Sequence, residues 1–135
     1  MIKAAPKVPN PTIQHFFSSS ETKSFDFAIR IVRLNKYLRD KKKEFVLSKQ
    51  LLKSGTSIGA NVAEAECGQS KADFYAKMYI ALKEANETYY WLRLLHESKY
   101  LTHKQFESIE EDTKAIIAIL TSICKTIKME KEKQS

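Results

Sequence analysis

Glycine and proline are scarce in this chain, and their scarcity restricts the fold. The 135 residues contain three glycines, at positions 55, 59 and 68, and three prolines, at positions 6, 9 and 11. These two residue types are the strongest interrupters of regular secondary structure. Long continuous helices are therefore permitted everywhere after Pro11.

Cysteine and long apolar runs are also sparse. Cys67 and Cys124 lack the spacing of a zinc or redox motif, so we expect both to be small buried apolar residues. No apolar run approaches the roughly 20 residues that span a bilayer, and residues 1–20 lack the apolar core of a secretion signal. We expect a soluble cytoplasmic protein without membrane contact.

Motifs for catalysis or cofactor binding are absent. The sequence has no glycine-rich phosphate-binding loop, no nucleophile elbow and no His-Glu-x-x-His zinc motif. His15, His96 and His103 stand apart from any residue that could complete a metal site or a catalytic triad. The Glu-x-x-His pairs of di-metal bundles do not occur either. We therefore predict no enzyme, no metal and no cofactor.

Four amphipathic segments with helical spacing fill most of the chain. Three of them open with the pattern of an N-terminal capping box, at Ser18-x-x-Glu21, Ser70-x-x-Asp73 and Thr102-x-x-Gln105. Long helices with short links predict an all-α, antiparallel up-down-up-down four-helix bundle over residues 19–130. We expect a flexible, proline-punctuated arm over residues 1–18 and a frayed tail over residues 131–135.

The first helix carries more apolar residues than one core face needs. One stripe contains Phe25, Ala28, Ile29 and Val32, and a second contains Phe27, Ile31, Leu34 and Leu38. Because a helix in a single bundle needs one apolar stripe, we expect this helix to be covered on more than one side.

The second helix contains a ridge of very small residues. Gly55, Gly59 and Ala63 recur every four residues and therefore share one helix face. An interior glycine costs about 1 kcal/mol of helix stability, which an unusually close neighbouring helix can offset. We predict a tight seam of the bundle here, formed by Gly55, Ile58, Gly59, Asn61, Val62, Ala63 and Glu64. A hydrogen-bonded packing network of Asn61, Glu64 and Asn86 is expected beside it.

Positive charge is concentrated in the first part of the chain. Residues 1–53 carry 12 Lys and Arg against 4 Asp and Glu, whereas residues 54–135 carry 11 against 12. Such an excess favours an acidic partner such as RNA or DNA, although basic residues at a helix end also stabilise the helix dipole. The candidate phosphate-binding residues are Arg30, Arg33, Lys36, Arg39, Lys41, Lys42 and Lys43.

The third helix carries an aromatic stripe beside its core stripe. Its candidate members are Tyr75, Tyr79, Tyr89 and Trp91. Such a stripe is most often part of a core. Because a complete core stripe accompanies it, an interface between subunits is the second interpretation and base stacking is the third.

Three stretches of the sequence resemble a known family. Leu47-Ser48-x-Gln50-Leu51 and Ser57-Ile58-x-x-Asn61-Val62-Ala63-Glu64-Ala65 are similar to the signature of the bacterial 23S rRNA-intervening-sequence proteins, and Tyr79-Ile80-Ala81-Leu82-Lys83-Glu84-Ala85 continues the likeness over roughly residues 22–125. Two positions depart from the pattern, since Ala65 stands where glycine is common and Gly59 where proline is frequent.

The resemblance implies a four-helix bundle that assembles into a ring-like homopentamer. It implies no catalytic residues. A related accessory protein of diversity-generating retroelements binds nucleic acid and a reverse transcriptase, so the resemblance also implies partners of these two kinds. We therefore predict a non-enzymatic oligomer that binds RNA or DNA through the basic surface of its first helix, without sequence preference. The alternative is a protein-interaction scaffold that has no contact with nucleic acid.

Overall fold

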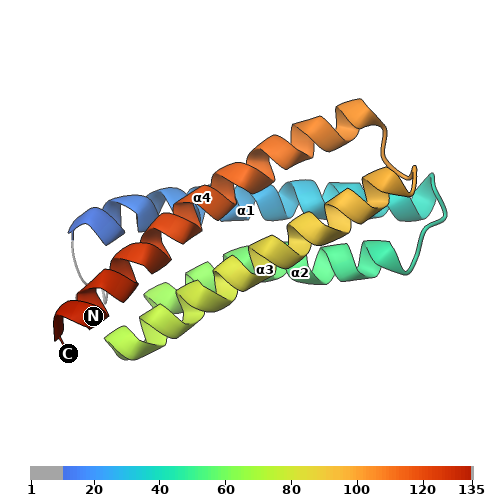
Figure 1. The fold of residues 1–135 in the computed structure, drawn as a ribbon. Helices are drawn as coiled ribbons and strands as arrows, with labels where there is room; N and C mark the ends of the chain where they lie inside the picture. Colours follow the sequence, from blue (N-terminus) through green and yellow to red (C-terminus); the bar gives the residue numbers. More distant parts are fainter. Residues whose placement is uncertain (1–10, 135) are drawn as a thin grey trace.

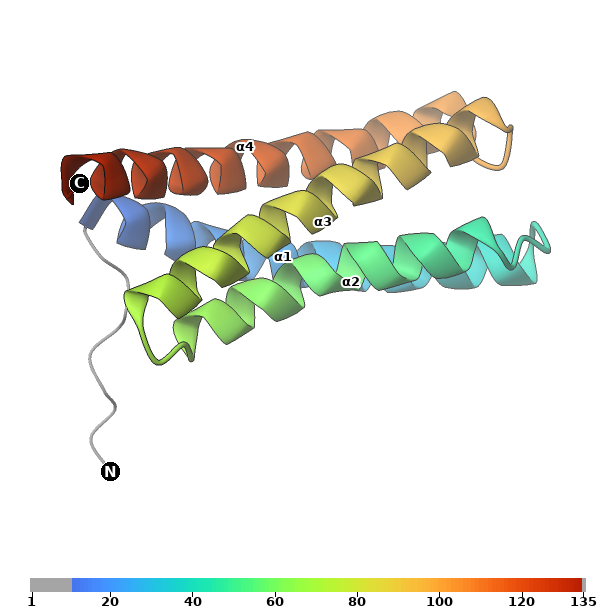
Figure 2. The same cartoon turned by 60° about the horizontal axis from the view of Figure 1, so that its bottom comes forward.

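Four long helices form an antiparallel bundle (Figures 1 and 2). The computed structural model describes residues 11–134, and its helices are α1 (Pro11–Asp40), α2 (Leu47–Glu66), α3 (Lys71–Glu97) and α4 (His103–Gln134). Both α1 and α3 pack against α2 and α4, so the four helices close into a square. No strand interrupts the described part of the chain, and the predicted all-α four-helix bundle is confirmed.

The ends of the bundle differ from the prediction. Helix α1 begins at Pro11 rather than at Ser18–Ser20. Proline is well suited to a first helical turn, where its missing N–H would have no partner in the helix. Ile13 and Phe17 anchor this extra length in the core. The expected arm is therefore wrong for residues 11–18, and residues 1–10 lie outside the described part. Helix α4 continues to Gln134, beyond the boundary expected at residue 130.

The core is formed by one apolar stripe from each helix. Phe27, Ile31 and Leu38 of α1 face inward, as do Met78 and Leu92 of α3. The other predicted stripe of α1 stays on the surface, with exposed fractions of 66% for Phe25, 37% for Ile29 and 51% for Val32. None of the helices described over residues 11–134 is long and apolar enough to cross a membrane.

The two cysteines lie in different surroundings. Cys124 is buried in α4, and burial raises the pKa of its thiol to about 11. Cys67 is exposed at the turn between α2 and α3. The expectation of two buried cysteines is therefore wrong for Cys67, which follows the last residue of α2 and has no helix face behind it.

The predicted seam exists, and it joins α2 to α1. A Cβ atom added to Gly55 would lie 2.8 Å from both γ carbons of Ile31, and one added to Gly59 would lie 3.2 Å from the Ser24 carbonyl oxygen. The Ile31 side chain at Gly55 and the α1 backbone at Gly59 therefore leave no room for a larger residue. Ile58 and Val62 are buried beside the seam.

Three seam residues do not take the expected role. Ala63 is exposed, so the close approach ends at Gly59. Asn61 donates to the Ser57 carbonyl of its own helix at 2.8 Å, and Glu64 forms an ion pair with Lys77 at 2.9 Å.

The expected polar network is also wrong. Asn86 donates to the Leu82 carbonyl at 3.1 Å, within α3, while Asn61 is bonded within α2. Each amide is satisfied by its own helix, because a side chain four residues along reaches the preceding turn.

We predict that Gly59→Leu lowers the free energy of unfolding by at least about 2 kcal/mol, because the new side chain must displace the α1 backbone. Ala63→Leu introduces the same side chain one turn further along α2 on an exposed site, and we expect a change of no more than about 0.5 kcal/mol. Urea denaturation followed by circular dichroism compares the two. Equal losses of stability in both variants would contradict the assignment of the seam.

Candidate functional site

Exposed cations gather where α1 passes into α2. This linker lies at the right-hand end of Figure 1. We call five of them the basic end: Lys36, Arg39, Lys41, Lys42 and Lys43. Residues 36–53 carry seven Lys and Arg against two carboxylates. Over the described residues, no member of the basic end takes part in an ion pair. Their charge is therefore available to an acidic partner.

Two lysines at this end of the bundle hold a backbone conformation that favours glycine. Lys43, in the α1–α2 linker, has φ of 54°, and Lys99, in the α3–α4 linker, has φ of 68°. The Tyr100 N–H donates to the Leu95 carbonyl at 2.9 Å and closes α3 around Lys99. A left-handed conformation costs a residue with a side chain roughly 1–2 kcal/mol. The chain thus keeps positive charge at two strained positions.

A buried carboxylate braces the α1–α2 linker. Glu44 is only 8% exposed. Its two carboxylate oxygens accept from the backbone N–H groups of Ser48 at 2.7 Å and Val46 at 3.3 Å, so the side chain caps the start of α2. Its carbonyl accepts from the Ser48 hydroxyl at 2.7 Å, and the Asn35 amide donates to the Ser48 carbonyl at 2.9 Å. The linker is therefore fixed to both helices.

The braced linker presents two apolar side chains to solvent. Phe45 is 54% exposed and Val46 is 70% exposed. Phe45 borders a hollow of about 310 Å³ between the last turns of α1 and the first turns of α2. The guanidinium carbon of Arg39 lies 6.0 Å from the centre of the Phe45 ring. The hollow is lined by Asn35, Arg39, Phe45, Ser48, Lys49 and Leu52.

These linker residues were missed by the sequence analysis. A signal was present, because Phe45 and Val46 follow directly after three lysines and Glu44. Apolar residues in a link between two helices lack a helix face through which to reach the core. Their exposure could therefore have been anticipated, whereas the hollow beside Phe45 depends on the packing of two helices.

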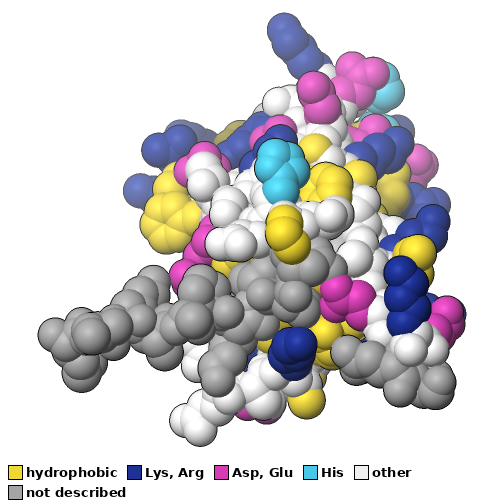
Figure 3. All heavy atoms as spheres, turned by 90° about the vertical axis from the view of Figure 1, so that its left-hand side faces the viewer, with side chains coloured by type: hydrophobic (Ala, Val, Ile, Leu, Met, Phe, Trp, Pro, Cys, Tyr) yellow, Lys and Arg dark blue, Asp and Glu magenta, His cyan; other side chains and the backbone are white. Residues whose placement is uncertain are grey.

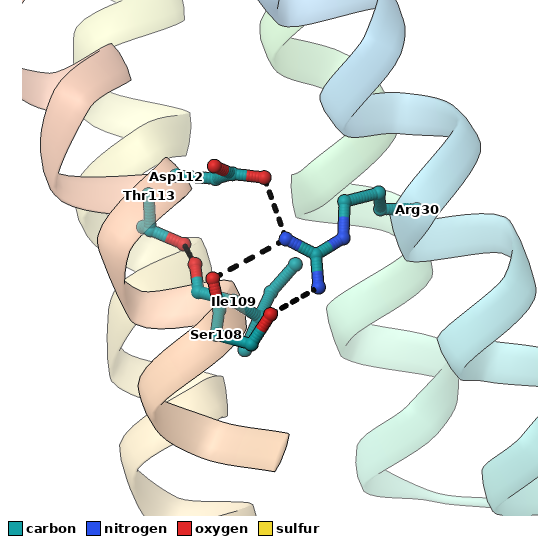
Figure 4. A network of polar contacts seen from close by, with 5 residues as sticks. All are labelled: Arg30, Ser108, Ile109, Asp112 and Thr113. Carbon is teal, nitrogen blue, oxygen red and sulfur yellow. Dashed lines mark hydrogen bonds and ion pairs between the residues drawn. The ribbon is translucent and has the colours of Figure 1, made fainter. Parts of the chain in front are cut away.

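Arg30 does not belong to the basic end. Its guanidinium contacts the Asp112 carboxylate at 2.6 Å and donates to the Ser108 carbonyl at 3.2 Å and the Ser108 hydroxyl at 3.0 Å (Figure 4). Arg30 therefore ties α1 to α4. Arg33 borders two neighbouring hollows between these helices, of about 440 and 520 Å³, and is exposed. The predicted phosphate-binding set is thus divided between a structural tie, a groove and the basic end.

The opposite end of the bundle carries both signs of charge. Figure 3 looks at that end, where α1 and α3 begin and α2 and α4 finish, and Lys and Arg are interspersed there with Asp and Glu. Lys77 pairs with Glu64 near this end. The unbalanced positive charge therefore distinguishes the α1–α2 linker.

The aromatic stripe of α3 mainly joins α3 to α4. Tyr75 is 6% exposed and donates to Glu130 at 3.2 Å, while its burial, together with Glu130, raises its pKa. The hydroxyl of Tyr79 donates to the Cys124 carbonyl at 3.1 Å. An interface role is wrong for Tyr75, which lies in the monomer core. It stays a prediction for Tyr79, Tyr89 and Trp91, which are partly accessible.

Comparisons with known proteins agree on one relationship. The family model of the 23S rRNA-intervening sequence proteins matches residues 20–122. A crystal structure from Bacteroides thetaiotaomicron, described as a protein of unknown function from the S23 ribosomal protein family, is 55% identical with a TM-score of 0.80. It covers 82% of this chain, and 98% of the Bacteroides chain is matched. No curated protein matches the chain.

We predict that Arg30→Gln lowers the free energy of unfolding by about 1 kcal/mol, because it removes the tie between α1 and α4. Arg33→Gln makes the same charge change on the same helix, and we expect a change of no more than about 0.5 kcal/mol. Denaturation at low and high salt measures both, and the Arg30 effect shrinks in high salt because the pair is half exposed. If both variants have the same free energy of unfolding, Arg30 has no structural role.

Proposed function

The chain belongs to the 23S rRNA-intervening sequence protein family, and we propose that it is a non-enzymatic protein that binds RNA or DNA through its basic end. One observation carries the proposal: five exposed cations cluster where α1 passes into α2, without ion-pair partners among the described residues. Phosphate groups are the ligands that such a cluster attracts most strongly.

The chemistry of the basic end favours binding that does not depend on base sequence. Four of its five cations are lysines, and a lysine ammonium acts on phosphate as a point charge rather than through a geometry specific to one base. Contacts to phosphate position a protein on nucleic acid but carry no sequence information. We therefore expect affinity that falls steeply with salt and varies little among sequences.

We also propose that copies of the chain assemble through the exposed stripe of α1. Phe25, Ile29 and Val32 lie four and three residues apart, so they share one face, and all three are accessible in the monomer. An apolar helix face on a soluble protein favours contact with another protein surface. The family resemblance implies a ring of five copies, which is the assembly that we propose. Such a ring would present several basic ends together, so that weak contacts reinforce one another.

We predict that replacing Lys41, Lys42 and Lys43 together by Gln weakens the binding of RNA and DNA at low salt at least tenfold. Three phosphate contacts are lost, so the slope of log affinity against log salt becomes shallower by about 2 to 3. Fluorescence anisotropy with labelled oligonucleotides of several sequences measures both quantities.

The matched control replaces Lys125, Lys128 and Lys133 by Gln, which removes the same charge from exposed sites on α4. It should bind almost as well as the unmodified protein. Equal losses in both triple variants would show that only net charge matters. Absence of any association at low salt, with a stoichiometric protein partner on purification, would support the protein-interaction scaffold instead.

We predict that the double variant Phe25→Asp, Val32→Asp has a lower mass in solution than the unmodified protein, because charge on the α1 stripe cannot be buried between copies. Light scattering after size exclusion measures the mass. Met129→Asp alters an exposed apolar residue outside the stripe and should leave the mass unchanged. An unmodified protein that is already monomeric at micromolar concentration would refute this assembly.

A further inference from the structure

We propose that the basic end selects single-stranded nucleic acid by stacking an unpaired base against Phe45, in the hollow between the last turns of α1 and the first turns of α2. This inference rests on the proposed function and names the form of nucleic acid that the same site binds.

The position of Phe45 is fixed by its neighbours. Glu44, directly before it, is held by the N–H groups of Ser48 and Val46, and Ser48 is held in turn by Asn35. Because these contacts fix the linker backbone, the ring is directed outward and remains 54% exposed. A base that stacks on it meets a surface that is already in place, which avoids the entropy of ordering a loop on binding.

The hollow beside Phe45 has the size and lining of a small ligand site. Its volume of about 310 Å³ lies at the lower limit of ligand pockets. Phe45 and Leu52 provide apolar surface for the faces of a flat ring.

Cations surround the hollow where a strand backbone would pass. Arg39 and Lys49 line it, and Lys41, Lys42 and Lys43 precede Glu44 and Phe45 in the same linker. An aromatic ring among cations is the arrangement by which proteins bind single strands, with the ring taking a base and the cations taking phosphates. The charge also favours this occupant over an apolar peptide.

A duplex cannot use Phe45 in this way. The base faces of a duplex are already stacked on one another, whereas an unpaired base has a free face for an aromatic side chain. The cations contact the phosphates of either form. Phe45 should therefore contribute to the affinity for single strands alone, and this difference separates stacking from simple charge attraction.

The test compares full-length protein and variants in binding a labelled single strand of about 12 nucleotides and a duplex of the same sequence at low salt. We expect Phe45→Ala to weaken single-strand binding roughly 5- to 150-fold, the range for the loss of one stacked base, and to leave duplex binding unchanged. Tyr90→Ala removes another exposed ring, on α3, which is 56% exposed. It should change neither single-strand binding nor duplex binding. Phe45→Trp should retain single-strand affinity, and its indole fluorescence should fall when a base stacks on it.

The outcomes separate this inference from the proposed function. If the Lys41, Lys42, Lys43→Gln variant loses binding while Phe45→Ala binds both forms like the unmodified protein, stacking is refuted and charge-driven binding stands. If no nucleic acid binds at all, both proposals fail. If the unmodified protein binds only phosphatidylserine vesicles and Phe45→Ala abolishes that binding, the basic end contacts membranes and the inference is overturned. Circular dichroism checks that each variant is folded.

Discussion

The close contact between α1 and α2 is the constraint on which the rest of the molecule depends. Gly55 and Gly59 remove the side chains that would separate the two helices, and Ile31 and Ser24 fill the space up to the backbone. Further along the same pair, Asn35 of α1 donates to the Ser48 carbonyl of α2. The two helices are therefore held together at several positions along their length, and the linker between them has little conformational freedom. The hollow beside Phe45 exists because these two helices cannot separate.

The basic residues of α1 serve two different physical purposes. Arg30 lies opposite Asp112 and Ser108, where its charge is satisfied within the molecule, and the pair of helices that it joins makes the least extensive contact of the four. The cations beyond residue 35 face solvent, and the nearby Glu44 carboxylate is occupied in capping α2. The basic residues of one stretch of sequence thus take different roles, because the surroundings of each side chain decide whether its charge is satisfied within the molecule or faces solvent.

Much of the fold could be predicted from sequence, because helical periodicity reports directly on burial. The helical spacing of Phe27, Ile31 and Leu38 grouped them in one apolar stripe of α1, and all three lie in the core. The start of α1 was misjudged because Pro11 was read as an interruption, although proline is favoured in a first turn. Exposed Ala63 was misplaced because spacing along one helix cannot show where the neighbouring helix diverges.

The candidate site was less predictable. The run of lysines is visible in the sequence, but neither the pairing of Arg30 with Asp112 nor the hollow beside Phe45 could be foreseen. Both involve residues brought together only when helices pack, in the first case from positions 82 apart in the chain. Local patterns give the charge of a segment, whereas tertiary contacts decide which charges remain available.

Because the antiparallel helices are even in number, both ends of the described chain lie at one pole of the bundle. The start of α1 and the last turn of α4 lie together at the pole opposite the α1–α2 linker (Figure 1). Anything fused to either end of the described chain would therefore project away from Phe45 and the lysines. In a ring with all copies in the same orientation, the attachments would crowd one rim and the cations would line the other. The two ends of the described chain and the exposed lysines of the α1–α2 linker are thus held at opposite poles of the bundle.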